Sequence, residues 1–145
     1  MTSDAPKEWR GRFFEDFNVG DVYRSRLGRT VTEADNVWFT CLTMNTNQIH
    51  FNEPYAAQTR FGKPLVNSTL TLALVTGLTV MDTSENGGVN LEWTDIKLPR
   101  PVFAGDTIWA ESEGQGVFGL EGTMVDLPVV ERARRVLREA KGAPG

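Results

Sequence analysis

Hydrophobic and polar positions alternate with a helical period in the stretch from Thr32 to Met44. Apolar residues recur there every three or four positions, which predicts an α-helix with one buried face. Thr32 followed by Asp35 nearly matches a capping box, so we expect the helix to begin at this point. The apolar positions of the predicted buried face are Ala34, Val37, Trp38, Cys41 and Leu42.

A second helical stretch, from Ser68 to about Met81, is apolar on almost every side. Such a helix must be surrounded by protein. Gly77 within it costs about 1 kcal/mol of helix propensity, so we expect another backbone to pass close by. A short helix is also predicted from Asn52 or Glu53, and Gly62 with Pro64 should follow its end.

Three further stretches are predicted strands. The charged stretch 22–31 suits a sheet edge. In 89–98 the alternation changes phase near Thr94 and Asp95, which predicts a bulge. In 106–113, Ile108 and Ala110 should face one side and Trp109 the other. One sheet around one buried helix is the simplest packing for this order of elements.

Composition narrows the class of protein. The 145 residues suit one domain, with 40% apolar and 23% charged residues, as in globular proteins. A net charge of −4 disfavours nucleic acid as a partner. The N-terminus lacks the apolar core of a signal peptide, and residues 65–81 are too interrupted to span a bilayer. The single cysteine, Cys41, permits a cytoplasmic location, and we expect it to be buried.

Candidate chemistry concentrates between Asn45 and Ser68. This stretch contains the only histidine, His50, in the polar loop that should follow the first helix. An imidazole can take up and release a proton at neutral pH, although a lone histidine is more often structural. One histidine and one cysteine cannot supply the usual zinc ligands, and no nucleotide-binding glycine motif is present. We therefore expect neither a metal nor a cofactor.

The motifs around His50 resemble those of the MaoC-like dehydratase family. They read Asn-Thr-Asn-Gln-Ile-His over 45–50, and Phe-Gly-Lys-Pro-Leu-Val-Asn-Ser over 61–68. Together with 70–77 and 98–107, they resemble the mesaconyl-CoA hydratase (β-methylmalyl-CoA dehydratase) branch. The resemblance covers residues 12–113.

This resemblance implies an α+β hotdog fold, in which a bent antiparallel sheet wraps a central helix. It implies a hydro-lyase that adds water to, or removes it from, an acyl-CoA thioester such as mesaconyl-CoA. It also implies a homodimer. We expect a flexible arm over 1–12, the hotdog domain over 13–116 and a divergent tail over 117–145.

The resemblance gives His50 the proton transfer, while Asn45 departs from the pattern. By resemblance, the family's hydratases have an aspartate at that position. An asparagine cannot take up and release a proton as an aspartate can. In one interpretation Asn45 orients the water while His50 moves the protons. In the other, the site is inactive or displaced, and Glu53 and Asp35 become the candidate acids. Asn47 either contacts substrate or only fixes the loop.

The start of the central helix is the candidate substrate-binding element. Asn67 and Ser68 favour helix caps, which explains them without any function. By resemblance, the backbone N–H of Ser68 or Thr69 would also stabilise the enolate-like oxygen of the thioester. Lys63, together with Arg60, is a candidate for binding coenzyme A phosphates, although such side chains are usually only solvated.

The tail does not follow the family. After Glu113 we expect two more strands by resemblance, whereas 114–122 contains four glycines and 128–141 has the stripe of a helix. One hypothesis is a shifted reading frame or a truncation; the alternative is that the tail helix covers the exposed face of the domain.

Two other functions fit part of the pattern. A hotdog thioesterase would need a carboxylate near the central helix, and none lies between Ser68 and Met81. A non-catalytic acyl-CoA-binding protein would be consistent with Asn45 and with the divergent tail.

Overall fold

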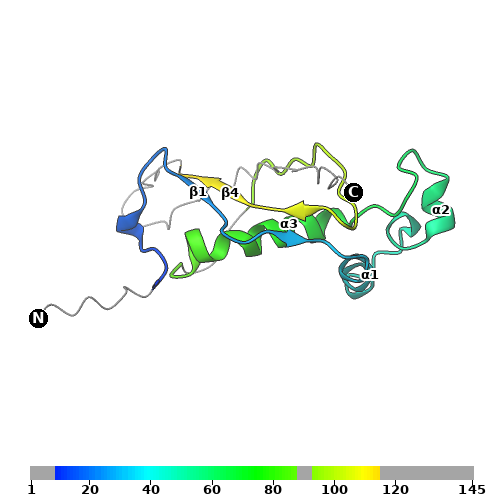
Figure 1. The fold of residues 1–145 in the computed structure, drawn as a ribbon, viewed down its shortest axis with the longest axis horizontal. Helices are drawn as coiled ribbons and strands as arrows, with labels where there is room; N and C mark the ends of the chain where they lie inside the picture. Colours follow the sequence, from blue (N-terminus) through cyan, green and yellow to red (C-terminus); the bar gives the residue numbers. More distant parts are fainter. Residues whose placement is uncertain (1–8, 88–92, 115–145) are drawn as a thin grey trace, which may run out of the picture.

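The structure is a computed structural model that describes residues 9–87 and 93–114 (Figure 1). It is an α+β arrangement, as predicted. In chain order the elements are η1 (Phe14–Asp16), β1 (Val22–Arg24), β2 (Arg29–Thr30), α1 (Glu33–Leu42), η2 (Gln48–His50), α2 (Glu53–Ala57), α3 (Ser68–Thr79), η3 (Val80–Ser84), β3 (Thr107–Ile108) and β4 (Glu111–Glu113). Segments η1 and η2 are 3-10 turns, and η3 is a π-helical turn that prolongs α3.

The strands form an antiparallel ribbon in two pieces. Strand β1 pairs with β4, with Tyr23 opposite Ser112, and β2 pairs with β3, with Arg29 opposite Ile108. The single strand predicted over 22–31 is therefore wrong, because four residues, 25–28, face only two on the other side, 109–110. Such an excess of residues on one side interrupts the ladder as a bulge does.

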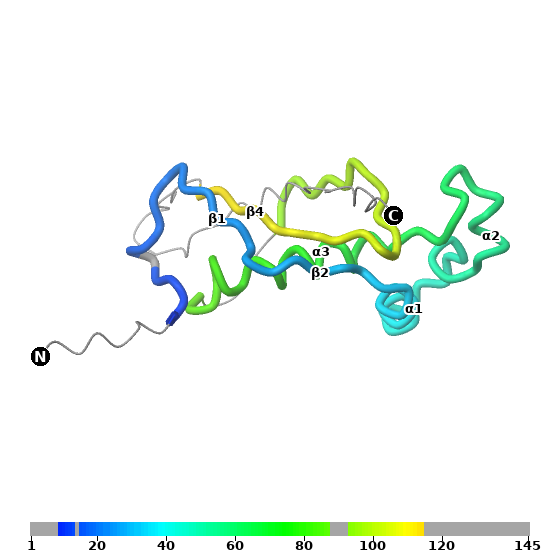
Figure 2. The backbone as a smooth tube through the Cα atoms, viewed as in Figure 1, coloured from blue at the N-terminus to red at the C-terminus, as the bar shows by residue number. Residues whose placement is uncertain are grey.

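The core lies between this ribbon and α3, which runs along it (Figure 2). Ile108 and Ala110 are buried and Trp109 is only partly buried, as their alternation predicted. Burying a side chain of the size of Ile108 contributes about 1.5–3 kcal/mol. The buried apolar cluster consists of Val31, Val66, Leu70, Val75, Val102, Ile108 and Ala110.

Helix α1 begins as predicted but buries the opposite side. Thr32 and Asp35 form a reciprocal capping box, which confirms the predicted start. The predicted apolar face is wrong, since Trp38 and Leu42 are 69% and 75% exposed and Cys41 is exposed too. Asn36 and Thr40 are buried instead. The buried side is polar because its side chains bond to groups of the His50 loop and the start of α3.

Helix α3 is less enclosed than its composition suggested. Apart from its chain neighbours and the nearby backbone of its own helix, no atom of the described chain lies within 4 Å of a Cβ built at Gly77, so the close backbone expected there is not found among the described residues. Ala73 is exposed as well. None of the helices in the described part of the chain is long and apolar enough to cross a membrane.

The predicted strand over 89–98 is also wrong in its described part, residues 93–98. Residues 93–98 form no strand, and Asp95 has a positive φ of 53°. A strand needs a neighbouring backbone to accept its hydrogen bonds, and no described segment pairs with this one. Residues 88–92 and the predicted tail helix 128–141 lie outside the described residues.

The end of the predicted N-terminal arm contacts the end of the central helical segment. Arg12 donates a hydrogen bond of 2.6 Å to the carbonyl oxygen of Asp82 in η3. Its guanidinium lies 4.8 Å from the Trp9 ring and 4.6 Å from the Tyr23 ring. The rest of the predicted arm, residues 1–8, is outside the described residues.

Candidate active site

Two asparagine side chains shape the loop that carries His50. The side-chain oxygen of Asn45 accepts a hydrogen bond of 3.0 Å from the backbone N–H of Asn47. The side-chain oxygen of Asn47 in turn accepts from the N–H of Ile49 at 3.2 Å and caps η2. Both residues therefore hold the loop in shape, and η2 ends at His50.

His50 is buried against the segment that leads into α3. Its Nδ1 lies 2.7 Å from the carbonyl oxygen of Leu65. A carbonyl oxygen only accepts hydrogen bonds, so Nδ1 carries the proton in this contact. In the neutral ring, Nε2 is then the unprotonated nitrogen and can accept a proton. The N–H of Leu65 also donates to the carbonyl of Ile49 at 3.0 Å, which fastens the two segments together.

The start of α3 is capped by Asn67, which is 3% exposed. Its side-chain oxygen accepts from the N–H of Thr69 at 3.1 Å and from the Thr69 hydroxyl at 2.7 Å. The Thr69 N–H is therefore already engaged. Of the two predicted donors for a substrate carbonyl, the Ser68 N–H is the one without a hydrogen bond to a described residue.

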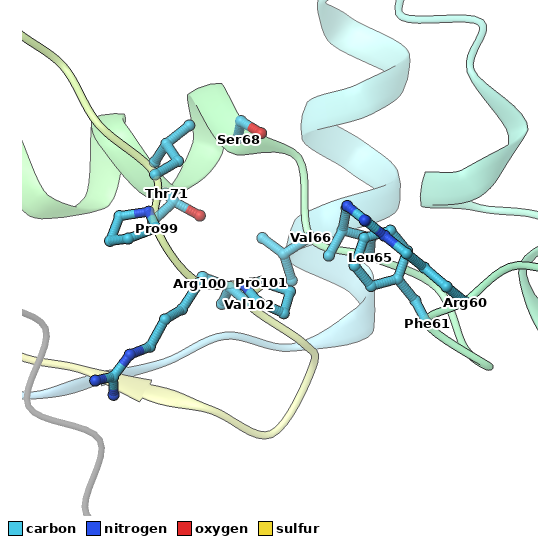
Figure 3. A pocket seen from close by; sticks show the side chains of 11 residues that line it. Arg60, Phe61, Leu65, Val66, Ser68, Thr71, Pro99, Arg100, Pro101 and Val102 are labelled. Carbon is cyan, nitrogen blue, oxygen red and sulfur yellow. The ribbon is translucent and has the colours of Figure 1, made fainter.

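A pocket of about 190 Å³ opens beside the start of α3 (Figure 3). Ser68 and Thr71 border it on the helix side, and residues 98–102 form another wall. Leu65 also lines it, so one residue both borders the pocket and binds the His50 ring. His50, Asn45 and Asn47 do not themselves line this pocket.

The two predicted phosphate-binding side chains are placed differently. Lys63 lies with its Nζ 4.4 Å from the ring centre of Phe103 and does not line the pocket. Arg60 lines the pocket, with its guanidinium 4.8 Å from the Phe61 ring. A cation over an aromatic face is held loosely enough at an exposed site to turn toward an anion.

Two contributions to the site were missed from the sequence. Asn36 bonds to the backbone on both sides of the site, and nothing in its local pattern marked it as buried. The wall formed by 98–102 is part of a stretch that resembled the family, so that signal was present but was not assigned to the pocket. Among residues 9–87 and 93–114, no group of three histidine, cysteine or acidic side chains could hold a metal ion.

Residues 16–131 match the family model described as a MaoC like domain. The chain belongs to this family. It is 31% identical over 102 residues to a mesaconyl-CoA hydratase of Cereibacter sphaeroides, a match that covers 70% of this chain and 30% of that protein. It is 27% identical over 138 residues to an (R)-specific enoyl-CoA hydratase of Rhodospirillum rubrum, which covers 90% of this chain and 94% of that protein.

Solved structures agree with the family. The (R)-hydratase from Aeromonas caviae superposes with a TM-score of 0.58 at 29% identity, over 72% of this MaoC-like chain and 76% of that one. This hydratase and the other structural neighbours of the chain confirm the predicted hotdog fold. The MaoC-like chain spans less than a third of the length of the mesaconyl-CoA hydratase that it matches.

Proposed function

We propose that this MaoC-like protein is a hydro-lyase that adds water to an enoyl-CoA thioester or removes it from a 3-hydroxyacyl-CoA. The observation that carries the proposal is the contact of His50 Nδ1 with the Leu65 carbonyl. It leaves Nε2 as a proton acceptor, and the Leu65 carbonyl that holds the ring lies two residues before Asn67, the cap of the most apolar helix. A base beside a pocket that has apolar walls, polar groups and a helix start at its edge suits an acyl thioester.

In the proposed hydration, Nε2 of His50 removes a proton from water as its oxygen bonds to the β-carbon. Charge moves to the thioester oxygen, which the Ser68 N–H stabilises; a donor of this kind contributes about 3 kcal/mol in the transition state. The imidazolium then returns the proton to the α-carbon, and the carbonyl re-forms. Dehydration follows the same steps in reverse.

Asn45 has a supporting part in this scheme. Its oxygen already accepts from Asn47, which leaves a second lone pair and the amide N–H groups for water or substrate. We assign it to orient the attacking water, while His50 carries the proton. Asn47 keeps the loop in place, and Asn67 and Thr69 hold the end of α3 that presents the Ser68 N–H.

Mesaconyl-CoA is our proposed substrate for two reasons. Relatives named mesaconyl-CoA hydratase match the chain, and Arg60 borders the pocket. Besides the thioester, its acyl group carries a free carboxylate, which a guanidinium binds well. The Arg60 guanidinium would bind a phosphate of coenzyme A equally well, since both groups are anions. Replacing Arg60 with glutamine separates the two: a loss on mesaconyl-CoA alone supports the acyl carboxylate, and an equal loss on crotonyl-CoA supports the phosphate.

We further propose that the protein is a cytoplasmic homodimer. Trp38 and Leu42, four residues apart on one side of α1, are 69% and 75% exposed, and Met44 just after the helix is 86% exposed. Large apolar side chains that gather on one surface are typical of an interface. Light scattering should give twice the chain mass, and Trp38→Glu should give the monomer mass. A monomeric wild-type protein would contradict the dimer.

The test of the hydro-lyase is hydration of mesaconyl-CoA and crotonyl-CoA by the wild type and by His50→Ala. We expect the variant to lose about 100- to 10,000-fold in rate, the usual contribution of a general acid–base group. Thr46→Ala, at an exposed position in the same loop, is the matched control and should keep wild-type activity. Equal rates for wild type and His50→Ala would refute the proposed role of His50.

A non-catalytic acyl-CoA-binding protein is the second candidate, and Asn45 in place of the family's aspartate favours it. Binding of an acyl-CoA without turnover by the wild type would select this alternative. Release of free coenzyme A thiol in the same assay would instead indicate a thioesterase.

A further inference from the structure

The side chain of Asn36 joins the two halves of the site. It is 3% exposed and lies on the buried side of α1. Its Nδ2 donates to the carbonyl of His50 at 2.7 Å and to the carbonyl of Leu65 at 3.2 Å. Its Oδ1 accepts from the backbone N–H of Asn67 at 2.8 Å. One buried amide therefore uses both of its donors and one acceptor on three backbone groups.

These contacts leave the amide only one orientation. If its oxygen and nitrogen were exchanged, the oxygen would face two carbonyl oxygens and the nitrogen would face an N–H group. Each of those pairs repels, and each would leave a buried polar group without a partner. The amide of Asn36 is thus matched to the local backbone, and no other uncharged side chain of its size offers two donors and an acceptor.

The Leu65 carbonyl is the point at which Asn36 and the His50 ring meet. This oxygen accepts from both His50 Nδ1 and Asn36 Nδ2. Asn36 therefore fixes the oxygen that holds the His50 ring, the backbone that carries the ring, and the N–H of the residue that caps α3. A base and an oxyanion donor must keep a set separation, because a shift of about 1 Å can cost about 100-fold in rate.

We infer that Asn36 is the positioning residue of this site: it keeps the proton of His50 on Nδ1 and holds the ring in register with the start of α3. This inference rests on the proposed hydratase function where it concerns rate. The part that concerns the tautomer of His50 is independent of the proposed function. Asn36 contacts no reacting atom, so its effect on catalysis acts entirely through His50 and the α3 cap.

His50 makes the inference directly measurable, because it is the only histidine and its ring nitrogens have no competing signals. Nitrogen NMR of the wild type should show the proton on Nδ1. Asn36→Asp keeps the size and the acceptor for Asn67 but removes both donors; Asn36→Ala removes all three contacts. In both variants we expect a mixture of tautomers and a kcat about 10- to 100-fold lower, with KM changed less than about threefold.

The control is Thr83→Val, in η3. It deletes a buried hydroxyl that donates to the carbonyl oxygen of Thr79, the last residue of α3, at 2.8 Å. It should lower thermal stability but leave the His50 tautomer and kcat unchanged. If the Asn36 variants melt earlier, as the control does, yet keep the proton on Nδ1, the inference is overturned. A wild type without hydration activity would refute the proposed function, while the tautomer comparison would still decide the part of Asn36.

Should neither Asn36 variant fold, the wild type supplies the test. The side-chain amide protons of Asn36 should exchange with solvent slowly, together with the Nδ1 proton of His50, because both belong to one buried cluster. Fast exchange of the Asn36 amide beside a protected His50 proton would show that the ring is held without Asn36, and would overturn the inference.

Discussion

Gly77 offers a sharp test of how α3 is packed. A Cβ at this position meets no described atom within 4 Å apart from its chain neighbours and the nearby backbone of its own helix, and the residue lies within α3. Replacing glycine by alanine within a helix stabilises it by about 1 kcal/mol when no contact opposes the methyl group. We therefore expect Gly77→Ala to raise the free energy of unfolding by about 1 kcal/mol.

The same helix provides the matched control. Ala73 is exposed and lies four residues earlier, on the same side of α3. Ala73→Gly should lower the free energy of unfolding by about 1 kcal/mol, and the double variant should come close to the wild type. Both effects come from backbone propensity alone, so their signs should be opposite and their sizes similar.

Urea denaturation followed by circular dichroism measures these differences. With a slope of about 2 kcal/mol per M, each single variant should move the midpoint by about 0.5 M, in opposite directions. A lower midpoint for Gly77→Ala would mean that a backbone or a partner covers this position, and would refute the reasoning. Repeating the titration at two protein concentrations separates a cover within the chain from a second copy.

Three further predictions concern other parts of the chain. Hydrogen bonds from Thr32 hold the pKa of Asp35 below its ordinary value of 3.8, so the capping contribution is present above that pH and is lost as the pH falls through the lower folded-state pKa; Asp35→Asn should therefore destabilise at neutral pH and have little effect near pH 2, by thermal melting. Gly28→Ala would place a methyl group against the Trp109 ring, closer than side-chain atoms pack, and should cost about 1–3 kcal/mol of unfolding free energy. Asn67→Ala should cost about 1 kcal/mol as a lost cap and also lower kcat, whereas Asn67→Asp should retain most of the stability because its oxygen can still accept from the helix N–H.

Caps and turns were predictable because their partners lie within a few residues. Thr32 with Asp35, Asn52 before α2 and Asn67 before α3 all bond to backbone groups two or three positions away. The faces of 108–110 were equally predictable, since alternation along a strand is itself a local property. The family motifs also identified the fold, because they include the residues that shape the His50 loop.

Long-range contacts decided the rest. The predicted buried face of α1 was wrong because periodicity reveals an apolar side but not what covers it. Asn36 is buried by partners 14 and 31 residues away, and His50 is oriented by a carbonyl 15 residues away. The strand over 22–31 was divided by an excess of residues that only its pairing with 107–113 could reveal.

The apolar composition of α3 and the presence of a histidine in a polar loop are properties of the sequence. They were enough to predict proton-transfer chemistry beside an apolar helix. The tautomer of that histidine, the engagement of the Thr69 N–H and the position of Arg60 at the pocket are properties of the packed molecule. They depend on which backbone groups meet across the fold, and a hydrogen bond between distant residues exists only once the intervening chain has closed the distance.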